Sequence, residues 1–143
     1  MSSLQTQDSD YERRIRESFA RQQVMQLIGA TLKRVEPGAV DINLPFREDL
    51  TQQNGFIHAG IITTVADSAC GYAAYTLMPA GSEVLSVEFK VNLLRPAEAE
   101  VFVAEARVLK AGKTLTVTRC DVYGKTGEVV KLIATMLATM IRR

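Results

Sequence analysis

The 143-residue sequence contains no tryptophan, one histidine and two cysteines, and it carries almost no net charge. With 17 basic against 16 acidic side chains and only 6% aromatic residues, it lacks the basic surface and stacking side chains typical of nucleic-acid-binding proteins. The two cysteines, Cys70 and Cys120, form no Cys-x-x-Cys pair, which argues against a disulfide scaffold, a zinc site and redox chemistry. We interpret both as packing residues, as we do Met136 and Met140.

Long apolar runs are also missing, because none reaches the roughly 20 residues that a helix needs to span a bilayer. The first residues are polar and of mixed charge, without the apolar core of a signal peptide or the arginine-rich composition of a transit peptide. We therefore expect a cytoplasmic protein with no membrane span. One domain should account for residues 1–143, with residues 1–9 as a flexible tail.

The hydrophobic pattern divides the rest of the chain into helical and extended segments. Residues 10–28 have helical periodicity, and Gly29 suits the end of that helix. Residues 30–36 and 39–46 predict two strands joined by a tight Pro-Gly turn. Residues 58–78, rich in alanine and isoleucine and almost uncharged, predict a helix enclosed by other structure.

From residue 83 onward the hydrophobic period is two, which predicts four long strands at 83–95, 98–110, 113–124 and 128–141. Their links are short, so we expect each strand to pair antiparallel with the next. The predicted architecture is α+β, with one long apolar helix wrapped by a five- to six-stranded, mainly antiparallel sheet and preceded by an N-terminal helix. Such a layer leaves a sheet edge and a face uncovered, so we expect a homo-oligomer.

The apolar helix contains the single histidine, His58, and a lone carboxylate, Asp67. Residues nine apart on a helix point to opposite sides and lie ~13 Å apart along the axis, so these two cannot pair within one helix. Cys70 lies ~18 Å from His58 along the axis, which also excludes a local Cys–His dyad. Two interpretations stay open: Asp67 is a satisfied buried acid and His58 a cap or loop residue, or a two-fold axis brings His58 of one chain near Asp67 of another. In the second, a carboxylate in apolar surroundings makes a useful base or nucleophile.

The start of the same helix has chemistry of its own. The sequence NGFIHAG places free backbone N–H groups and the positive end of the helix dipole at His58, Ala59 and Gly60. Such a helix start can hold an anion or a developing oxyanion. Gly55 and Gly60 would let a substrate approach the backbone closely.

Three stretches, NGFIHAGIITTVADSACGYAA, SVEFKVNLLRPA and KAGKTLTVTRCDV, together resemble the hotdog-fold acyl-CoA thioesterases of the phenylacetate-associated, PaaI-like type. The resemblance covers about residues 28–141. That family has His-Gly-Gly at the helix start and an Asp nine residues after the His, a spacing that His58 and Asp67 match. It implies a hotdog fold and hydrolysis of an acyl or aryl-acyl coenzyme A thioester in a homodimer or homotetramer. Coenzyme A then enters as part of the substrate, and neither a separate cofactor nor a metal is expected.

The resemblance also implies catalytic roles. It makes Asp67 the general base or nucleophile and places the oxyanion at the Ala59 N–H, beside Gly60, with Asp67 and the helix start coming from different subunits. Gln52 stands where relatives often have an Asn that holds the attacking water, and Ser86 matches a Ser or Thr that assists it. The plainer alternatives are loop capping for Gln52 and a strand hydroxyl for Ser86. Two departures from the family, Ala59 for the first Gly and Gln52 for Asn, bear on rate and substrate preference more than on fold.

Substrate binding is expected at Asn54 and Gly55 and at three basic residues near strand ends and turns, Arg95, Lys110 and Lys113. In relatives, basic residues around the KAGKT turn contact the coenzyme A phosphates, whereas the alternative here is solvated turn charges. Two other functions stay open. One is a hotdog enoyl-thioester hydratase or dehydratase, and the other is a non-catalytic acyl-CoA-binding protein, which the absence of a helix-turn-helix pair before Gly29 makes less favoured.

Overall fold

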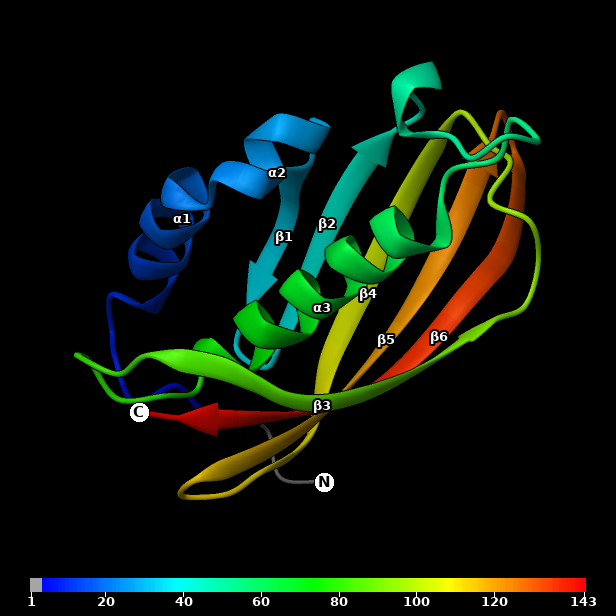
Figure 1. The fold of residues 1–143 in the computed structure, drawn as a ribbon. Coiled ribbons are helices and arrows are strands. Elements are labelled where there is room, and N and C mark those ends of the chain that lie inside the picture. The colour runs from blue at the N-terminus through cyan, green and yellow to red at the C-terminus, as the bar shows by residue number, and fades with distance from the viewer. Residues whose placement is uncertain (1–3) are drawn as a thin grey trace.

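The apolar segment that follows His58 forms the central helix of the protein, α3 (Ala59–Tyr75). In the computed structural model, which describes residues 4–143, α3 crosses the hollow of a curved six-stranded sheet (Figure 1). Nine of its 17 residues are buried, so the helix is covered on most sides, as its lack of charge predicts. Within the described residues no helix is both long and apolar enough to cross a membrane.

The six strands have the alternating pattern that the sequence predicts, and all five strand pairs are antiparallel. Their order across the sheet is β1-β2-β4-β5-β6-β3. The strands are β1 (Thr31–Glu36), β2 (Ala39–Pro45), β3 (Val84–Leu93), β4 (Val101–Ala111), β5 (Leu115–Thr126) and β6 (Val129–Arg142). The predicted hotdog architecture, one apolar helix wrapped by a six-stranded sheet, is therefore confirmed.

One expected pairing is wrong, because β3 does not pair with β4, the next strand along the chain. Both sides of β4 are occupied by β2 and β5, so β3 has no free edge there. It pairs instead with β6, with Ser86 opposite Met140 and Leu93 opposite Ala134. The short Pro-Ala link lies in a crossing segment, residues 94–100, and not in a hairpin. As a result β3 is an edge strand, and its outer side is unpaired among the described residues.

The predicted N-terminal helix is two helices, α1 (Tyr11–Arg21) and α2 (Gln23–Ile28). Between them Gln22 is extended, with φ −80° and ψ 94°, and its side chain reaches α3, where it contacts Ser68 and Tyr72. Gly29 ends α2 in the left-handed conformation at φ 80°, as expected of a glycine at that position. A short 3-10 helix, η1 (Glu48–Leu50), precedes the loop that leads into α3.

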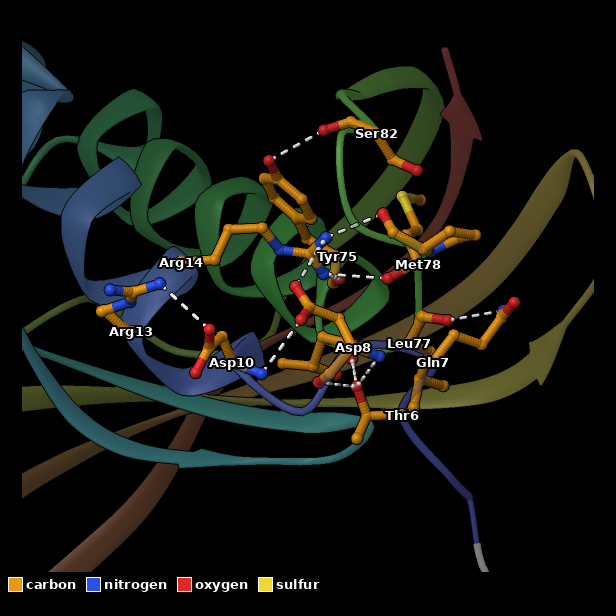
Figure 2. A network of polar contacts seen from close by, with 12 residues as sticks. Thr6, Gln7, Asp8, Asp10, Arg13, Arg14, Tyr75, Leu77, Met78 and Ser82 are labelled. Atoms are coloured by element: carbon orange, nitrogen blue, oxygen red, sulfur yellow. Dashed lines mark hydrogen bonds and ion pairs between the residues drawn. The ribbon is translucent and has the colours of Figure 1, made fainter.

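Within the segment expected to be a flexible tail, residues 6–8 contact the C-terminal end of α3 and the residues just beyond it (Figure 2). Thr6 Oγ1 donates to the Thr76 carbonyl at 2.8 Å, and Gln7 Nε2 donates to the Leu77 carbonyl at 3.0 Å. A helix end leaves its last carbonyl groups unpaired, and these donors satisfy two of the carbonyls just beyond α3. Residues 1–3, the rest of the expected tail, lie outside the described residues.

Arg14 of α1 completes this end of the helix (Figure 2). Its guanidinium donates to the carbonyls of Tyr75, Met78 and Pro79 at 2.8–2.9 Å. It also lies 4.4 Å from the centre of the Tyr75 ring and 3.4 Å from the Asp8 carboxylate. A cation at the negative end of the helix dipole is favourable, so Arg14 fixes α1 against α3.

Candidate active site

Asp67 lies midway along α3, on the side that faces the edge strand β3. Ser86 of β3 donates a hydrogen bond from Oγ to Asp67 Oδ1 at 2.6 Å. Ser86 lies opposite the buried Met140 of β6, with its Oγ 3.4 Å from Met140 Sδ, and a bulge in β3 follows at once. No Lys, Arg or His of residues 4–143 forms an ion pair with the Asp67 carboxylate. The second carboxylate oxygen is therefore not engaged by a cation.

A cavity of about 590 Å³ surrounds this pair, between α1, α3 and β3. We call it the Asp67 cavity. Its walls include Ser18 from α1, Gln22 from the break between α1 and α2, and Gly71 and Tyr72 from α3. A volume of this size is within the range of small-molecule sites, so the carboxylate faces a space that can hold a ligand.

The start of α3 presents one free donor, the backbone N–H of Ala59. His58 donates its own N–H to the Leu50 carbonyl at 3.0 Å, and its Nδ1 accepts the Gly60 N–H at 2.8 Å. His58 is thus the N-cap of α3, one of the two roles left open for it by the sequence. The cap also explains the glycine at position 60, since a Cβ there would lie 3.0 Å from His58 Nδ1. Across the part of the chain that the structure describes, no acceptor takes the Ala59 N–H.

The loop before α3 is ordered by the side chain of Gln52. Its Oε1 accepts the backbone N–H of Asn54 at 2.5 Å and of Phe56 at 3.4 Å, and Gly55 turns the chain at φ 86°. This is the capping role that was the plainer expectation for Gln52. Its amide NH₂ group has no acceptor among residues 4–143 and remains able to donate to a ligand.

Gln52, His58 and Ala59 line a second cavity, of about 530 Å³, which we call the helix-start cavity. Arg95 also lines it and donates to the Leu132 carbonyl at 2.8 Å. Asp67 and Ser86 do not line this cavity, and His58 does not line the Asp67 cavity. Within one chain, the Asp67 carboxylate and the start of α3 therefore face different cavities, as their nine-residue spacing requires.

The two lysines expected to bind coenzyme A lie elsewhere. Lys110 is near the end of β4 and Lys113 in the β4–β5 turn, where it lines a third cavity beside Leu77 and Met78. These neighbours follow the C-terminal end of α3, a helix whose 17 residues span about 25 Å. A single chain does not bring either lysine to the helix start, and their role stays a prediction.

The cysteines are not nucleophiles. Cys70 and Cys120 are both fully buried and free. The neighbouring Cys70 thiol and burial raise the pKa of Cys120 well above its ordinary value, so the thiolate is disfavoured. Met136 and Met140 are buried too, in agreement with the packing role expected for all four residues.

Asp67 and Ser86 are the lining residues of the Asp67 cavity that the sequence analysis named, and those it missed include Ser18, Gln22, Ser68, Gly71 and Tyr72. Gly71 follows Asp67 by four residues, so helical spacing alone places it on the same face one turn later. That signal was available in the sequence. Ser18 and Gln22 had no comparable signal, because only the break between α1 and α2 brings them to α3.

Comparison with known proteins identifies the family. The model of the thioesterase superfamily matches residues 54–131, which include the start of α3, Asp67 and Ser86. The chain belongs to the thioesterase superfamily. It is a thioester hydrolase by family, and the resemblance to acyl-CoA thioesterases of the hotdog fold is confirmed.

The superfamily assignment rests on similar sequences as well as similar folds. The crystal structure of a thioesterase family protein from Silicibacter pomeroyi has 50% sequence identity and a TM-score of 0.91, covering 92% of this chain and 97% of that one. Human acyl-coenzyme A thioesterase 13 is 32% identical over 102 residues, which are 70% of this chain and 72% of the human protein. The PaaI protein of the Escherichia coli phenylacetic acid degradation operon has a TM-score of 0.85 over 96% of both chains, and at 16% identity it shares the fold alone.

Proposed function

We propose that this thioesterase hydrolyses an acyl-coenzyme A thioester at a site built from two subunits. The observation that supports the proposal is the separation of Asp67 and Ser86 from the free Ala59 N–H in two cavities of one chain. Hydrolysis of a thioester needs a base within hydrogen-bond reach of the water and a donor about 3 Å from the developing oxyanion. A second chain supplies the missing half of each site.

The edge strand β3 offers the surface for that second chain. It is ten residues long, its outer edge is unpaired in the described structure, and it exposes several large apolar side chains. These are Leu85, Val87, Phe89 and Leu93. A long apolar edge strand of this kind promotes aggregation unless it is covered. Pairing of β3 with the β3 of a second copy about a two-fold axis covers both edges and sets the two α3 helices side by side in opposite directions.

The chemistry follows from this arrangement. Ser86 holds Oδ1 of Asp67, which leaves Oδ2 to take a proton from water as the water oxygen attacks the thioester carbonyl carbon. The carbonyl oxygen gains negative charge and is stabilised by the Ala59 N–H and the positive end of α3 of the partner subunit. The coenzyme A thiolate then leaves as the C–S bond breaks and takes the proton held by Asp67, which returns the carboxylate to its starting state. The alternative in which Asp67 attacks the carbonyl directly uses the same residues.

Coenzyme A itself is bound at the helix start in this proposal. Arg95 lines that cavity and supplies a positive charge for a phosphate, with Asn54 and Gly55 in the adjoining loop. Lys110 and Lys113 can join this site only from another subunit. Two free buried thiols fit a reducing compartment, and we place the enzyme in the cytoplasm.

A hydratase is disfavoured by the state of His58. A hydratase histidine must take a proton from the substrate, yet Nδ1 of this ring accepts the Gly60 N–H, so the neutral ring carries its proton on Nε2 and has no free lone pair to act as a base. We therefore assign His58 a structural role at the helix start and retain the thioesterase as the proposed function.

The test is free-thiol release from a panel of acyl-coenzyme A substrates. Wild type should turn over at least one member, and Asp67→Asn should lose about 10²–10⁴-fold in kcat, because a general base typically contributes that much. Ser86→Ala should lose less and keep the same melting temperature. Absence of turnover across short, medium, long and aryl thioesters, with tight acyl-coenzyme A binding, would instead establish a binding protein.

A subunit-mixing experiment tests the shared site. Asp67→Asn and Ala59→Pro are inactive separately, but a heterodimer of the two contains one site with both groups intact. Random assortment makes half of the dimers mixed, so co-expression should restore about a quarter of wild-type activity. No recovery from mixed dimers of confirmed composition would place the whole site within one chain.

A further inference from the structure

The wall of the Asp67 cavity opposite β3 is polar, and its side chains are linked by hydrogen bonds. The Ser18 and Tyr72 hydroxyl oxygens lie 3.2 Å apart, Tyr72 donates to Gln22 Oε1 at 3.4 Å, and Gln22 Nε2 donates to Ser68 Oγ at 3.1 Å. With Tyr72 donating to Gln22, Ser18 donates to Tyr72, and the chain of donors runs toward Ser68. Burial raises the pKa of Tyr72, which keeps its hydroxyl protonated and able to donate.

The last member of this chain has an unused proton. Ser68 is only 8% exposed and follows Asp67 directly on α3. Its oxygen accepts from Gln22, but no residue in the range 4–143 accepts its hydroxyl hydrogen. A buried hydroxyl normally finds an acceptor, so a donor left over on a cavity wall points to an acceptor on a ligand.

Gly71 opens the space beside this donor. It lies one turn after Asp67 in a helix otherwise rich in alanine, where glycine is less favourable than alanine. A Cβ at Gly71 would meet no atom of a neighbouring element within 4 Å among the described residues, so neither packing within the chain nor φ requires the glycine. The missing side chain instead widens the Asp67 cavity.

The charges around the cavity decide what kind of acceptor fits. The charged residues that line it are Arg21, Asp67 and Glu83, which sum to one negative charge. A carboxylate on the ligand would face this net negative lining beside the Asp67 carboxylate, and like charges are unfavourable at short range. A neutral oxygen, such as a hydroxyl or a carbonyl, carries no such penalty.

We propose that the Asp67 cavity holds the acyl group of the substrate, that Gly71 sets the width available to it, and that Ser68, oriented by Gln22, binds a neutral oxygen on the acyl group remote from the thioester. The inference depends on the proposed thioesterase function and specifies its substrate class. The N-terminal helices then belong to the specificity site, since the break at Gln22 is what carries its amide to α3.

Matched acyl-coenzyme A pairs test the polar part of this proposal. Hexanoyl and octanoyl thioesters are compared with their ω-hydroxy derivatives, with adipoyl-coenzyme A as the charged analogue and acetyl-coenzyme A as a small reference. One hydrogen bond is worth about 1 kcal/mol, so wild type should favour a hydroxylated member about fivefold in kcat/KM. Ser68→Ala should abolish that preference, so that the hydroxylated and unsubstituted members of each pair have equal kcat/KM in the variant. Adipoyl-coenzyme A should be no better than hexanoyl-coenzyme A.

Tyr72→Phe and Tyr75→Phe provide a matched control. Both tyrosines come from α3 and line the same cavity, but the Tyr75 hydroxyl donates to the Ser82 carbonyl at 2.9 Å and is not part of the chain. Tyr72→Phe should reduce the hydroxyl preference, and Tyr75→Phe should keep it. Equal loss in the two variants, or no preference for either hydroxylated member in wild type, would overturn the assignment of Ser68 and Gln22.

Gly71→Leu tests the location of the acyl group. It should lower kcat/KM for octanoyl-coenzyme A at least tenfold and for acetyl-coenzyme A less than threefold, with an unchanged or higher melting temperature. An unaltered octanoyl-to-acetyl ratio in the folded variant would show that the acyl group lies elsewhere. Failure of the thioesterase function itself gives a distinct result, because wild type would then turn over none of these substrates.

Discussion

Replacement of Ala59 by proline removes the proposed oxyanion donor while keeping the helix. Ala59 is the first residue of α3, a position where proline is favoured because its missing N–H has no partner in the helix. The preceding residue, His58, has φ −58° and ψ 137°, which is the extended conformation that a following proline requires. The proline ring would replace the Ala59 amide hydrogen, for which no acceptor exists within residues 4–143. Ala59 lines the helix-start cavity of about 530 Å³, which leaves space for the ring.

The size of the effect follows from the role of a single donor. Loss of one oxyanion donor typically costs about 10²–10³ in kcat, equivalent to about 3–4 kcal/mol of transition-state stabilisation. Stability should change by less than about 1 kcal/mol, because the substitution breaks no hydrogen bond of the helix. The variant therefore separates catalysis from folding more cleanly than a substitution at Asp67, whose carboxylate also bonds Ser86.

The assay is thiol release at saturating acyl-coenzyme A, with thermal unfolding followed by circular dichroism on the same samples. Ala59→Gly is the matched control, since it keeps the N–H and restores the glycine that relatives have at this position. It should retain or exceed wild-type kcat. A folded Ala59→Pro enzyme with kcat within threefold of wild type would refute the oxyanion role of this N–H.

Three further predictions concern other parts of the molecule. Arg14→Met should lower the free energy of unfolding by about 2–4 kcal/mol in urea titrations, because three carbonyls and a carboxylate lose a charged partner. Arg13→Met is the control: its side chain is 70% exposed, so the free energy of unfolding should change by less than about 0.5 kcal/mol. Cys70 and Cys120 should not react with a disulfide reagent in the native protein and should react fully in denaturant; rapid native labelling would contradict their burial and the raised pKa of Cys120. Leu93→Glu on the outer strand should produce monomers in sedimentation experiments and lose activity with them, and an active monomer would contradict the shared site.

Much of the fold was predictable because its signals are local. The apolar helix at 59–75, the period-two strands and the left-handed Gly29 each follow from a few consecutive residues. The pairing of β3 with β6 was not predictable from the sequence, because it depends on which strand of the finished sheet has a free edge. The break at Gln22 was also missed, and no local pattern indicates its contacts with Ser68 and Tyr72, which lie 46 and 50 positions further along the chain.

The candidate site divides in the same way. The separation of His58 from Asp67 follows from helix geometry and needs no structure. The contact of Ser86 with Asp67 joins β3 to α3, and the resemblance to a family pointed to Ser86 where spacing alone could not. The role of Ser68 was invisible in the sequence, because a serine in a buried helix is ordinary until its donor is found to lack an acceptor.

In the proposed dimer, the spacing of His58 and Asp67 connects catalysis to assembly. If the carboxylate lay one turn from the helix start, the base and the oxyanion donor would face one cavity of one chain, and each monomer could act alone. Nine residues turn Asp67 to the opposite side of α3, toward the edge strand that exposes its apolar side chains to a partner. The same half-turn that prevents a site within the chain thus directs the base to the surface where, in the proposed dimer, the second chain supplies the donor. Any change that weakens the β3 edge should therefore lower activity in proportion to the dimer lost, with kcat per dimer unchanged.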